Sequence, residues 1–279
     1  MVSFPNCKIN LGLNIVRKRT DGYHDLETIF LPIPLFDIIE VVAVESKNDP
    51  EVDIQLTISG NILEDEPKNN LCYKAYQILK KDFPDLPKVQ IHLHKVIPTG
   101  AGLGGGSADG AFMLALLNDK FDLRISKEKL LEYSLQLGSD CPFFILNKPC
   151  FASGRGEVLH EINIDLSDYK ILLVNPGIHV STASAFSEIN PEVPARSLKE
   201  IISRPVSEWK NEMRNDFEKS VFKNYPEIQK IKNDLYQMNA EYVSMTGSGS
   251  SVFGLFKKEV HINRNFPSTY FVKELFCKF

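Results

Sequence analysis

A run of glycines within residues 98–109 restricts the fold of this chain more than any other feature of its sequence. The segment reads Pro98-Thr99-Gly100-Ala101-Gly102-Leu103-Gly104-Gly105-Gly106-Ser107-Ala108-Asp109, with five glycines in seven positions. Glycine lets the backbone approach a ligand closely and accepts positive φ, so successive N–H groups can point at one anion. The alternative is a turn in which tight packing alone demands glycine.

The flanking residues predict a strand before this loop and a helix after it. Apolar and polar residues alternate from Val89 to His94, which indicates a half-buried strand. The run 111–117 is apolar on every side, which indicates a buried helix that begins near Ser107. The free N–H groups and positive dipole end of such a helix would add to the loop. We therefore expect an anion-binding cradle that contains no lysine.

The loop differs from two familiar phosphate-binding patterns. No Gly-Lys-Ser/Thr follows the glycines, so it is not a P-loop. Gly100, Gly102 and Gly105 do match the dinucleotide pattern G-x-G-x-x-G. That pattern requires a second strand ending in an acidic residue about 20 positions later. Residues 121–129 read instead as a polar connection to another helix, so dinucleotide binding is kept only as an alternative.

Composition indicates an ordinary globular protein. The 279 residues are 43% hydrophobic and 24% charged, and no apolar run approaches the roughly 18 residues of a membrane-spanning helix. The first ten residues lack a signal-peptide pattern, and the five cysteines show no C-x-x-C spacing, so we expect a cytoplasmic protein without membrane association. A net charge of −4 without a basic block argues against nucleic acid as a partner.

Strand and helix patterns are mixed without regular alternation, which predicts an α+β fold. Strand patterns cover residues 8–16 and 38–44, and Ser126 is the expected N-cap of an amphipathic helix. A new strand pattern begins at Tyr169. We therefore expect two domains, 1–165 and 166–279.

Four positions are candidates for chemistry on local grounds. Lys8 interrupts an apolar strand, which indicates either a residue facing a cleft or an edge-strand lysine in water. Asp140, two residues before Pro142, could accept a hydroxyl proton or cap a short helix. Ser107 could cap the helix after the loop, bind Mg²⁺, or do both. Tyr23, after the turn at Asp21-Gly22, belongs either to a pocket or to an exposed hairpin.

Three segments together resemble the GHMP kinases, the superfamily that includes galactokinase, homoserine kinase and mevalonate kinase. The glycine-rich loop is similar to their signature Pro-x-x-x-Gly-Leu-Gly-Ser/Gly-Ser/Gly-Ser. The strand that carries Lys8 and the segment Thr246–Ser251 resemble their amino-terminal strand and late glycine-rich motif. Residues 8–13 and 21–26 resemble the branch that phosphorylates 4-diphosphocytidyl-2-C-methyl-D-erythritol.

This resemblance implies an amino-terminal domain like domain 2 of ribosomal protein S5 and a ferredoxin-like carboxy-terminal domain. It implies a kinase that uses ATP and Mg²⁺ to phosphorylate the 2-hydroxyl of this cytidine diphosphate-linked sugar alcohol. The reaction belongs to the non-mevalonate, or methylerythritol phosphate, pathway to isoprenoid and terpenoid precursors. A GHMP kinase acting on mevalonate, homoserine or a sugar is the first alternative, and an RNA-binding module is another. The sequence does not indicate the oligomeric state.

The resemblance also implies roles for individual residues. Lys8 and Asp140 match the catalytic pair, and Ser107 is a candidate Mg²⁺ ligand. The substrate pocket is matched by Asn10, Tyr23, His24, Thr182 and Phe186, with Tyr23 and Phe186 enclosing the cytosine ring. The ATP phosphates are matched by Pro98, Gly100, Ala101, Gly102, Leu103, Gly104, Gly105, Gly106 and Ser107, and the late motif by Gly247, Ser248, Gly249 and Ser250. Two departures are Cys7 in place of the usual alanine, and Ala108 where a second serine is common.

Overall fold

The chain divides into two units, and each unit combines segments that are far apart in the sequence. The structure is a computed structural model, and it describes residues 1–44, 53–61, 66–187, 189–263 and 265–277. The first unit contains residues 1–7, 35–99 and 104–147, and the second contains residues 8–34, 100–103 and 148–279. Because each unit combines several separate segments, this division does not test a single boundary in the sequence. The expected domain boundary near residue 165 therefore stays a prediction.

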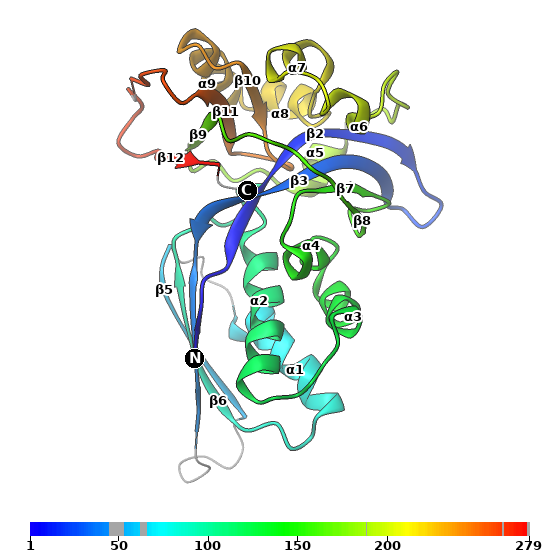
Figure 1. Cartoon of the computed structure of the whole chain (residues 1–279), viewed down its shortest axis with the longest axis vertical. Helices are drawn as coiled ribbons and strands as arrows, with labels where there is room; N and C mark the ends of the chain where they lie inside the picture. Colours follow the sequence, from blue (N-terminus) through cyan, green and yellow to red (C-terminus); the bar gives the residue numbers. More distant parts are fainter. Residues whose placement is uncertain (45–52, 62–65, 188, 264, 278–279) are drawn as a thin grey trace. The chain divides into compact units, whose positions relative to one another are not determined.

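A four-stranded sheet covered by helices on one face forms the first unit. Its strand order is β1-β4-β6-β5, in which only the β5–β6 pair is parallel. The strands are β1 (Val2–Ser3), β4 (Ile38–Ala43), β5 (Ile54–Gly60) and β6 (Val89–Lys95). The helices are η1 (Pro67–Asn69), α1 (Leu71–Asp82), α2 (Gly105–Lys120), α3 (Lys127–Leu137) and α4 (Cys141–Leu146). Helices α1 and α2 lie on the same side of β5 and β6 (Figure 1).

Alternation along the strands explains why only one face of this sheet is covered. In β6 the apolar residues Val89, Ile91 and Leu93 are buried, while Gln90 and His92 are exposed. The buried side chains pack against α1 and α2 in one hydrophobic core, which includes Met113, Leu114 and Leu117 of α2. The predicted half-buried strand and buried helix are confirmed.

The helix after the glycine loop begins earlier than predicted. Helix α2 starts at Gly105, and its N-cap is Gly104, whose φ of 69° is left-handed. Ser107 is therefore the third residue of the helix, and the prediction that it caps α2 is wrong. Gly104 takes the backbone conformation that ends the loop, which a serine could not adopt without strain. The predicted N-cap Ser126 is confirmed, since its hydroxyl accepts a hydrogen bond from Lys129 N.

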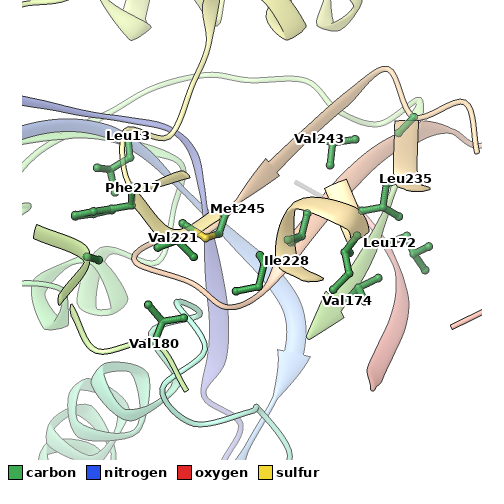
Figure 2. Packing of buried hydrophobic residues seen from close by; sticks show 14 of the residues in the cluster. Leu13, Leu172, Val174, Val180, Phe217, Val221, Ile228, Leu235, Val243 and Met245 are labelled. Atoms are coloured by element: carbon green, nitrogen blue, oxygen red, sulfur yellow. The ribbon is translucent and has the colours of Figure 1, made fainter. Parts of the chain in front are cut away.

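An antiparallel sheet in the order β10-β11-β9-β12 organises the second unit. Its strands are β9 (Tyr169–Asn175), β10 (Tyr242–Met245), β11 (Val252–Lys257) and β12 (Phe271–Phe276). The helices between β9 and β10 are α5 (Thr182–Ser187), α6 (Leu198–Ile201), α7 (Val206–Glu212), α8 (Glu218–Asn224) and α9 (Pro226–Gln237). Figure 2 shows Ile228 and Leu235 of α9 in the same core as Leu172 and Val174 of β9.

This strand order is the one expected for a ferredoxin-like domain. The described residues between β11 and β12 contain turns but no helix, so the second crossover helix of that fold is replaced by irregular chain. A further sheet, in the order β2-β3-β7-β8, consists of β2 (Asn6–Lys18), β3 (His24–Phe36), β7 (Cys150–Ser153) and β8 (Val158–Glu161).

Two kinds of element are absent from the parts of the chain that the structure describes. Residues 121–149 are all described and contain no strand, so the second strand of a dinucleotide-binding unit does not follow α2. Within the described ranges, every helix is too short or too polar to cross a membrane.

Candidate active site

Lys8 is buried near the start of strand β2, at 4% exposure, between the fully buried Cys7 and Ile9. Its Nζ donates a hydrogen bond of 2.7 Å to Asn10 Oδ1 and lies 4.9 Å from the centre of the Phe30 ring. The alternative of an edge-strand lysine in water is therefore wrong. A buried ammonium needs polar partners, and Asn10 supplies one of them.

Asn10 connects this lysine to the late glycine-rich segment. Its backbone N–H donates to Thr246 Oγ1 at 3.0 Å, and its side-chain amide donates to Thr28 Oγ1 at 2.9 Å. The Thr246 hydroxyl lies 3.1 Å from both Asn10 Oδ1 and the Gly102 carbonyl oxygen. Its single proton can serve only one of these acceptors at a time. Asn10 and Thr246 are both buried, so this network fixes the end of β10 against β2.

The two glycine-rich segments touch through their backbones. Gly102 has a φ of +76°, and a Cβ placed on it would lie 2.0 Å from the Thr246 carbonyl oxygen. Ser251 N donates to the Ala101 carbonyl at 3.2 Å, and Lys8 N donates to the Leu103 carbonyl at 3.0 Å. Residues 101–103 are thus held by the first and last of the three motifs. All of these contacts lie within the second unit.

The glycines of the loop serve different purposes. Gly102 is demanded by packing, which is the alternative that the sequence left open. A Cβ on Gly106 would meet nothing within 4 Å, and Gly106 is exposed in the first turn of α2. The N-cap residue, Gly104, has no side chain that could cap this helix start. Free backbone N–H groups beside an open surface at a helix N-terminus suit an anion such as a phosphate group.

Replacing Thr246 by valine is expected to lower the free energy of unfolding by about 1–3 kcal/mol, because the buried Asn10 N–H loses its acceptor. Thr246→Ser keeps the hydroxyl and should lose less. Denaturant unfolding of the two variants measures the difference. A loss in Thr246→Ser as large as that in Thr246→Val would contradict this expectation, because the methyl group of Thr246 would then contribute as much as its hydroxyl.

Asp140 and Ser107 belong to the first unit. Asp140 occupies the N-cap position of α4, but its carboxylate makes no capping hydrogen bond. The capping alternative for this side chain is therefore wrong. Ser107 hydrogen-bonds to the thiol of Cys141, whose pKa is raised to about 12, mainly by burial. Both residues offer oxygen ligands of the kind that Mg²⁺ prefers.

The expected substrate residues of the second unit form two contacts. The rings of His24 and Phe186 stack with centroids 4.8 Å apart at 19°, and Phe186 meets Phe217 edge-on at 4.7 Å. Burial lowers the pKa of His24 from 6.5, and the charge of Lys18 lowers it further. Thr182 Oγ1 lies 3.0 Å from Ser248 Oγ, so the expected pocket wall meets the late glycine-rich motif.

Tyr23 does not join the stack of His24 and Phe186. It is 56% exposed, and the Arg155 guanidinium lies 5.0 Å from the centre of its ring. The ring stacked on Phe186 is that of His24, whereas the resemblance implied that Tyr23 and Phe186 face each other across the cytosine ring. The remaining expected residues, Gly247, Gly249 and Ser250, lie in the connection between β10 and β11, where Ser250 Oγ accepts from the Asn175 side chain at 3.1 Å.

Sequence reasoning missed a polar segment that supports the late motif. Asn215 Nδ2 donates to the carbonyls of Met245 and Gly247, each at 2.8 Å. Asp216 accepts from Ile15 N at 2.7 Å, and Glu218 accepts from Met245 N at 2.9 Å. The sequence Asn-Asp-Phe-Glu stands among other polar residues, from Lys210 to Ser220, so the local pattern contains no signal that sets it apart.

A cavity of about 1050 Å³ also lies in the second unit, beside Asn14, the segment 192–196 and the chain from Asn211 to Ser220. It contains none of the expected site residues. The three motifs, and not this cavity, define the candidate active site.

Comparisons with known proteins agree with these motifs. Residues 70–148 match the family model described as "GHMP kinases N terminal domain", and residues 197–264 match "GHMP kinases C terminal". A protein of Bacteroides fragilis named 4-diphosphocytidyl-2-C-methyl-D-erythritol kinase is 56% identical over 264 residues, which cover 95% of each chain. The chain belongs to this kinase family. A member from Bacteroides thetaiotaomicron is 48% identical and covers 99% of this chain and 98% of its own.

A solved structure titled as 4-(cytidine 5'-diphospho)-2C-methyl-D-erythritol kinase is 27% identical, with a TM-score of 0.75 and complete coverage of both chains. Membership of this family confirms the predicted α+β, two-domain GHMP kinase fold and the prediction that the chain is a kinase. The dinucleotide-binding alternative is wrong.

Proposed function

We propose that this chain transfers the γ-phosphoryl group of ATP to the 2-hydroxyl of 4-diphosphocytidyl-2-C-methyl-D-erythritol. The observation that carries the proposal is the buried network of Lys8, Asn10, Thr246 and Gly102, which joins all three kinase motifs within one unit. The same proposal assigns the chain to the non-mevalonate route to isoprenoid precursors. It also assigns residues 1–165 to ATP binding and catalysis.

The phosphate end of ATP binds to the glycine-rich loop. Gly104, Gly105 and Gly106 present backbone N–H groups at the uncapped start of α2, and the helix dipole favours negative charge there. Residues 100–103 are fixed by Thr246 and Ser251, which keeps the loop in one conformation. A fixed set of donors stabilises the phosphates without reorganising during the reaction.

The acceptor hydroxyl gives its proton to Asp140. We assign Lys8 as the second catalytic residue, whose ammonium stabilises the negative charge that spreads over the phosphoryl group in transfer. Burial strengthens this interaction, since Lys8 is 4% exposed.

Ser107 is the residue proposed to hold Mg²⁺, because its hydroxyl is a hard oxygen donor of the kind that this ion takes. When bound, the ion neutralises phosphate charge. Because Ala108 has no hydroxyl, this chain offers fewer oxygen ligands for Mg²⁺ than a chain with a second serine at that position.

The cytidine end of the acceptor binds beside Phe186, with Asn10, Tyr23, His24 and Thr182 completing the pocket. Stacking of the cytosine ring on Phe186 distinguishes a cytidyl compound from a bare sugar alcohol. The five cysteines are buried and form no disulfide in the described part of the chain, which fits the reducing cytoplasm, where we place the reaction. The electrostatics of a chain of net charge −4 suit a small substrate and not a nucleic acid.

The direct test measures Mg²⁺-dependent ATP consumption with single candidate acceptors. We expect turnover with 4-diphosphocytidyl-2-C-methyl-D-erythritol and none with methylerythritol phosphate, mevalonate or homoserine. Turnover with mevalonate or homoserine would keep the kinase assignment and overturn the acceptor. Absence of turnover with every acceptor would overturn the proposed function.

The affinity for the cytidyl acceptor is expected to depend on pH through His24. Because burial lowers the pKa of His24 below the ordinary histidine value of 6.5, its ring is neutral at neutral pH and protonates only at lower pH. Protonation draws the ring toward water and disturbs its stack on Phe186, so the KM for the acceptor should rise in that range while the KM for ATP stays constant. His24→Gln should abolish this dependence. An unchanged pH response in the variant would assign it to another group.

A further inference from the structure

Three ionisable side chains form a buried cluster in the first unit. Asp37, Lys95 and Asp109 are 0%, 7% and 2% exposed. Lys95 Nζ donates to Asp37 Oδ2 and, at 2.6 Å, to Asp109 Oδ2. We refer to these three residues as the Lys95 cluster. None of them belongs to the site residues proposed above.

The Lys95 cluster joins the chain entering the phosphate loop to the chain leaving it. Lys95 is the last residue of β6, three positions before Pro98, and Asp109 lies in the second turn of α2. Asp37 Oδ1 also accepts from the N–H groups of Val96 and Ile97, at 2.6 and 2.8 Å. Every residue from Lys95 to Ile97 is therefore fixed by a carboxylate of the cluster.

Close packing accompanies these bonds. A Cβ on Gly105, the first residue of α2, would lie 2.9 Å from Ile97 Cγ2 and 3.5 Å from Lys95 Nζ. The helix thus starts directly against the end of β6. Both ends of the loop are consequently held in one place within the first unit.

Stability alone is a poor explanation for such a cluster. Removing three charges from water costs several kcal/mol per ion, and apolar side chains of similar volume usually do as well or better. The charges are also unbalanced, with two carboxylates for one ammonium. In addition, Asp109 Oδ1 is buried and has no hydrogen-bond partner among the residues that the structure describes. What the cluster provides is a fixed geometry.

We propose that the Lys95 cluster is a positioning group that holds both ends of the phosphate loop in the ATP-binding conformation before ATP arrives. A segment with five glycines in seven positions loses more conformational freedom on ordering than other chains do. Fixing its ends in the free protein removes part of that cost from ATP binding. The proposal rests on the proposed function only in taking the loop as the ATP phosphate site.

The test compares variants of Asp109 by their affinity for a non-hydrolysable ATP analogue and by the KM values for ATP and acceptor. Asp109→Asn keeps an oxygen that accepts from Lys95, whereas Asp109→Leu has a similar volume and no acceptor. We expect Asp109→Leu to weaken analogue binding and raise the KM for ATP by roughly 10- to 100-fold, without changing the KM for the acceptor. Asp109→Asn should stay close to wild type.

Equal losses in the two variants would overturn the proposal, because the charge of Asp109 and not its bond to Lys95 would then matter. If Asp109→Leu does not fold, the double variant Lys95→Met with Asp109→Leu removes opposite charges together and leaves Asp37 bonded to Val96 and Ile97. We expect that double variant to fold and to bind the ATP analogue roughly 10- to 100-fold more weakly than the wild type. A folded double variant with unchanged analogue affinity would overturn the proposal.

A matched control separates positioning from general loss of a buried ion pair. Lys170 is 7% exposed, like Lys95, and pairs with Glu274 at 3.1 Å on the sheet of the second unit. Lys170→Met should leave analogue affinity unchanged, and an equal loss there would overturn the positioning role. Wild-type turnover with a different acceptor would overturn the proposed function and leave this test valid, since analogue affinity does not involve the acceptor.

Discussion

Replacing Asp140 by asparagine is expected to lower kcat by about 10³-fold, within the range measured for loss of a general base. Asparagine has the same shape but cannot take the proton of the acceptor hydroxyl. Helix α4 should be retained in the variant, because the Asp140 carboxylate makes no capping bond to it that the substitution could remove. Steady-state kinetics and thermal unfolding of the purified variant measure both quantities.

The control for this substitution is Asp119→Asn, on the exposed surface of α2. It should keep wild-type kcat and stability. An Asp140→Asn enzyme that keeps more than about a tenth of the wild-type kcat would contradict the role of proton acceptor and leave Asp140 with at most an orienting role.

Replacing Gly102 by alanine is expected to have the largest effect on structure. The new Cβ would lie 2.0 Å from the Thr246 carbonyl oxygen, and both partners are backbone, so neither can rotate away. Together with the φ of +76°, this clash should cost about 3 kcal/mol or more of unfolding free energy. Because the same contact fixes the loop, we also expect a loss of ATP affinity. Denaturant unfolding and analogue binding measure the two effects.

Gly177 provides the matched control. Its φ is also +76°, but a Cβ there would meet nothing within 4 Å. Gly177→Ala therefore carries the backbone strain without the clash and should cost only about 1–2 kcal/mol. If both variants lost the same stability, the contact between the glycine-rich segments would contribute nothing measurable.

Local pattern was sufficient for the elements around the loop. The alternation in β6, the apolar run in α2 and the cap at Ser126 follow from periodicity and turn chemistry, and the structure confirms them. The start of α2 was placed two residues too late, because a serine is a better cap by propensity than a glycine. The left-handed backbone of Gly104 overrides that preference.

Contacts between distant segments could not be predicted from pattern. The sequence assigned Tyr23 and His24 from one turn, but their different partners, Arg155 and Phe186, are set by tertiary packing. The glycines of the loop look alike in sequence, although Gly102 faces a carbonyl and Gly106 faces open space. Only the fold distinguishes a glycine required for packing from one available to a ligand.

The bond between Asn10 and Thr246 also has a consequence for biosynthesis. Thr246 follows Asn10 by 236 positions, so the ribosome makes it long after Asn10. From the completion of the loop until Thr246 is made, the nascent chain therefore has a phosphate loop without its anchor, even though every residue of the first unit has been made by position 147. A ribosome that stalls before β10 produces a chain in which Lys8 and Asn10 have no late glycine-rich segment to join.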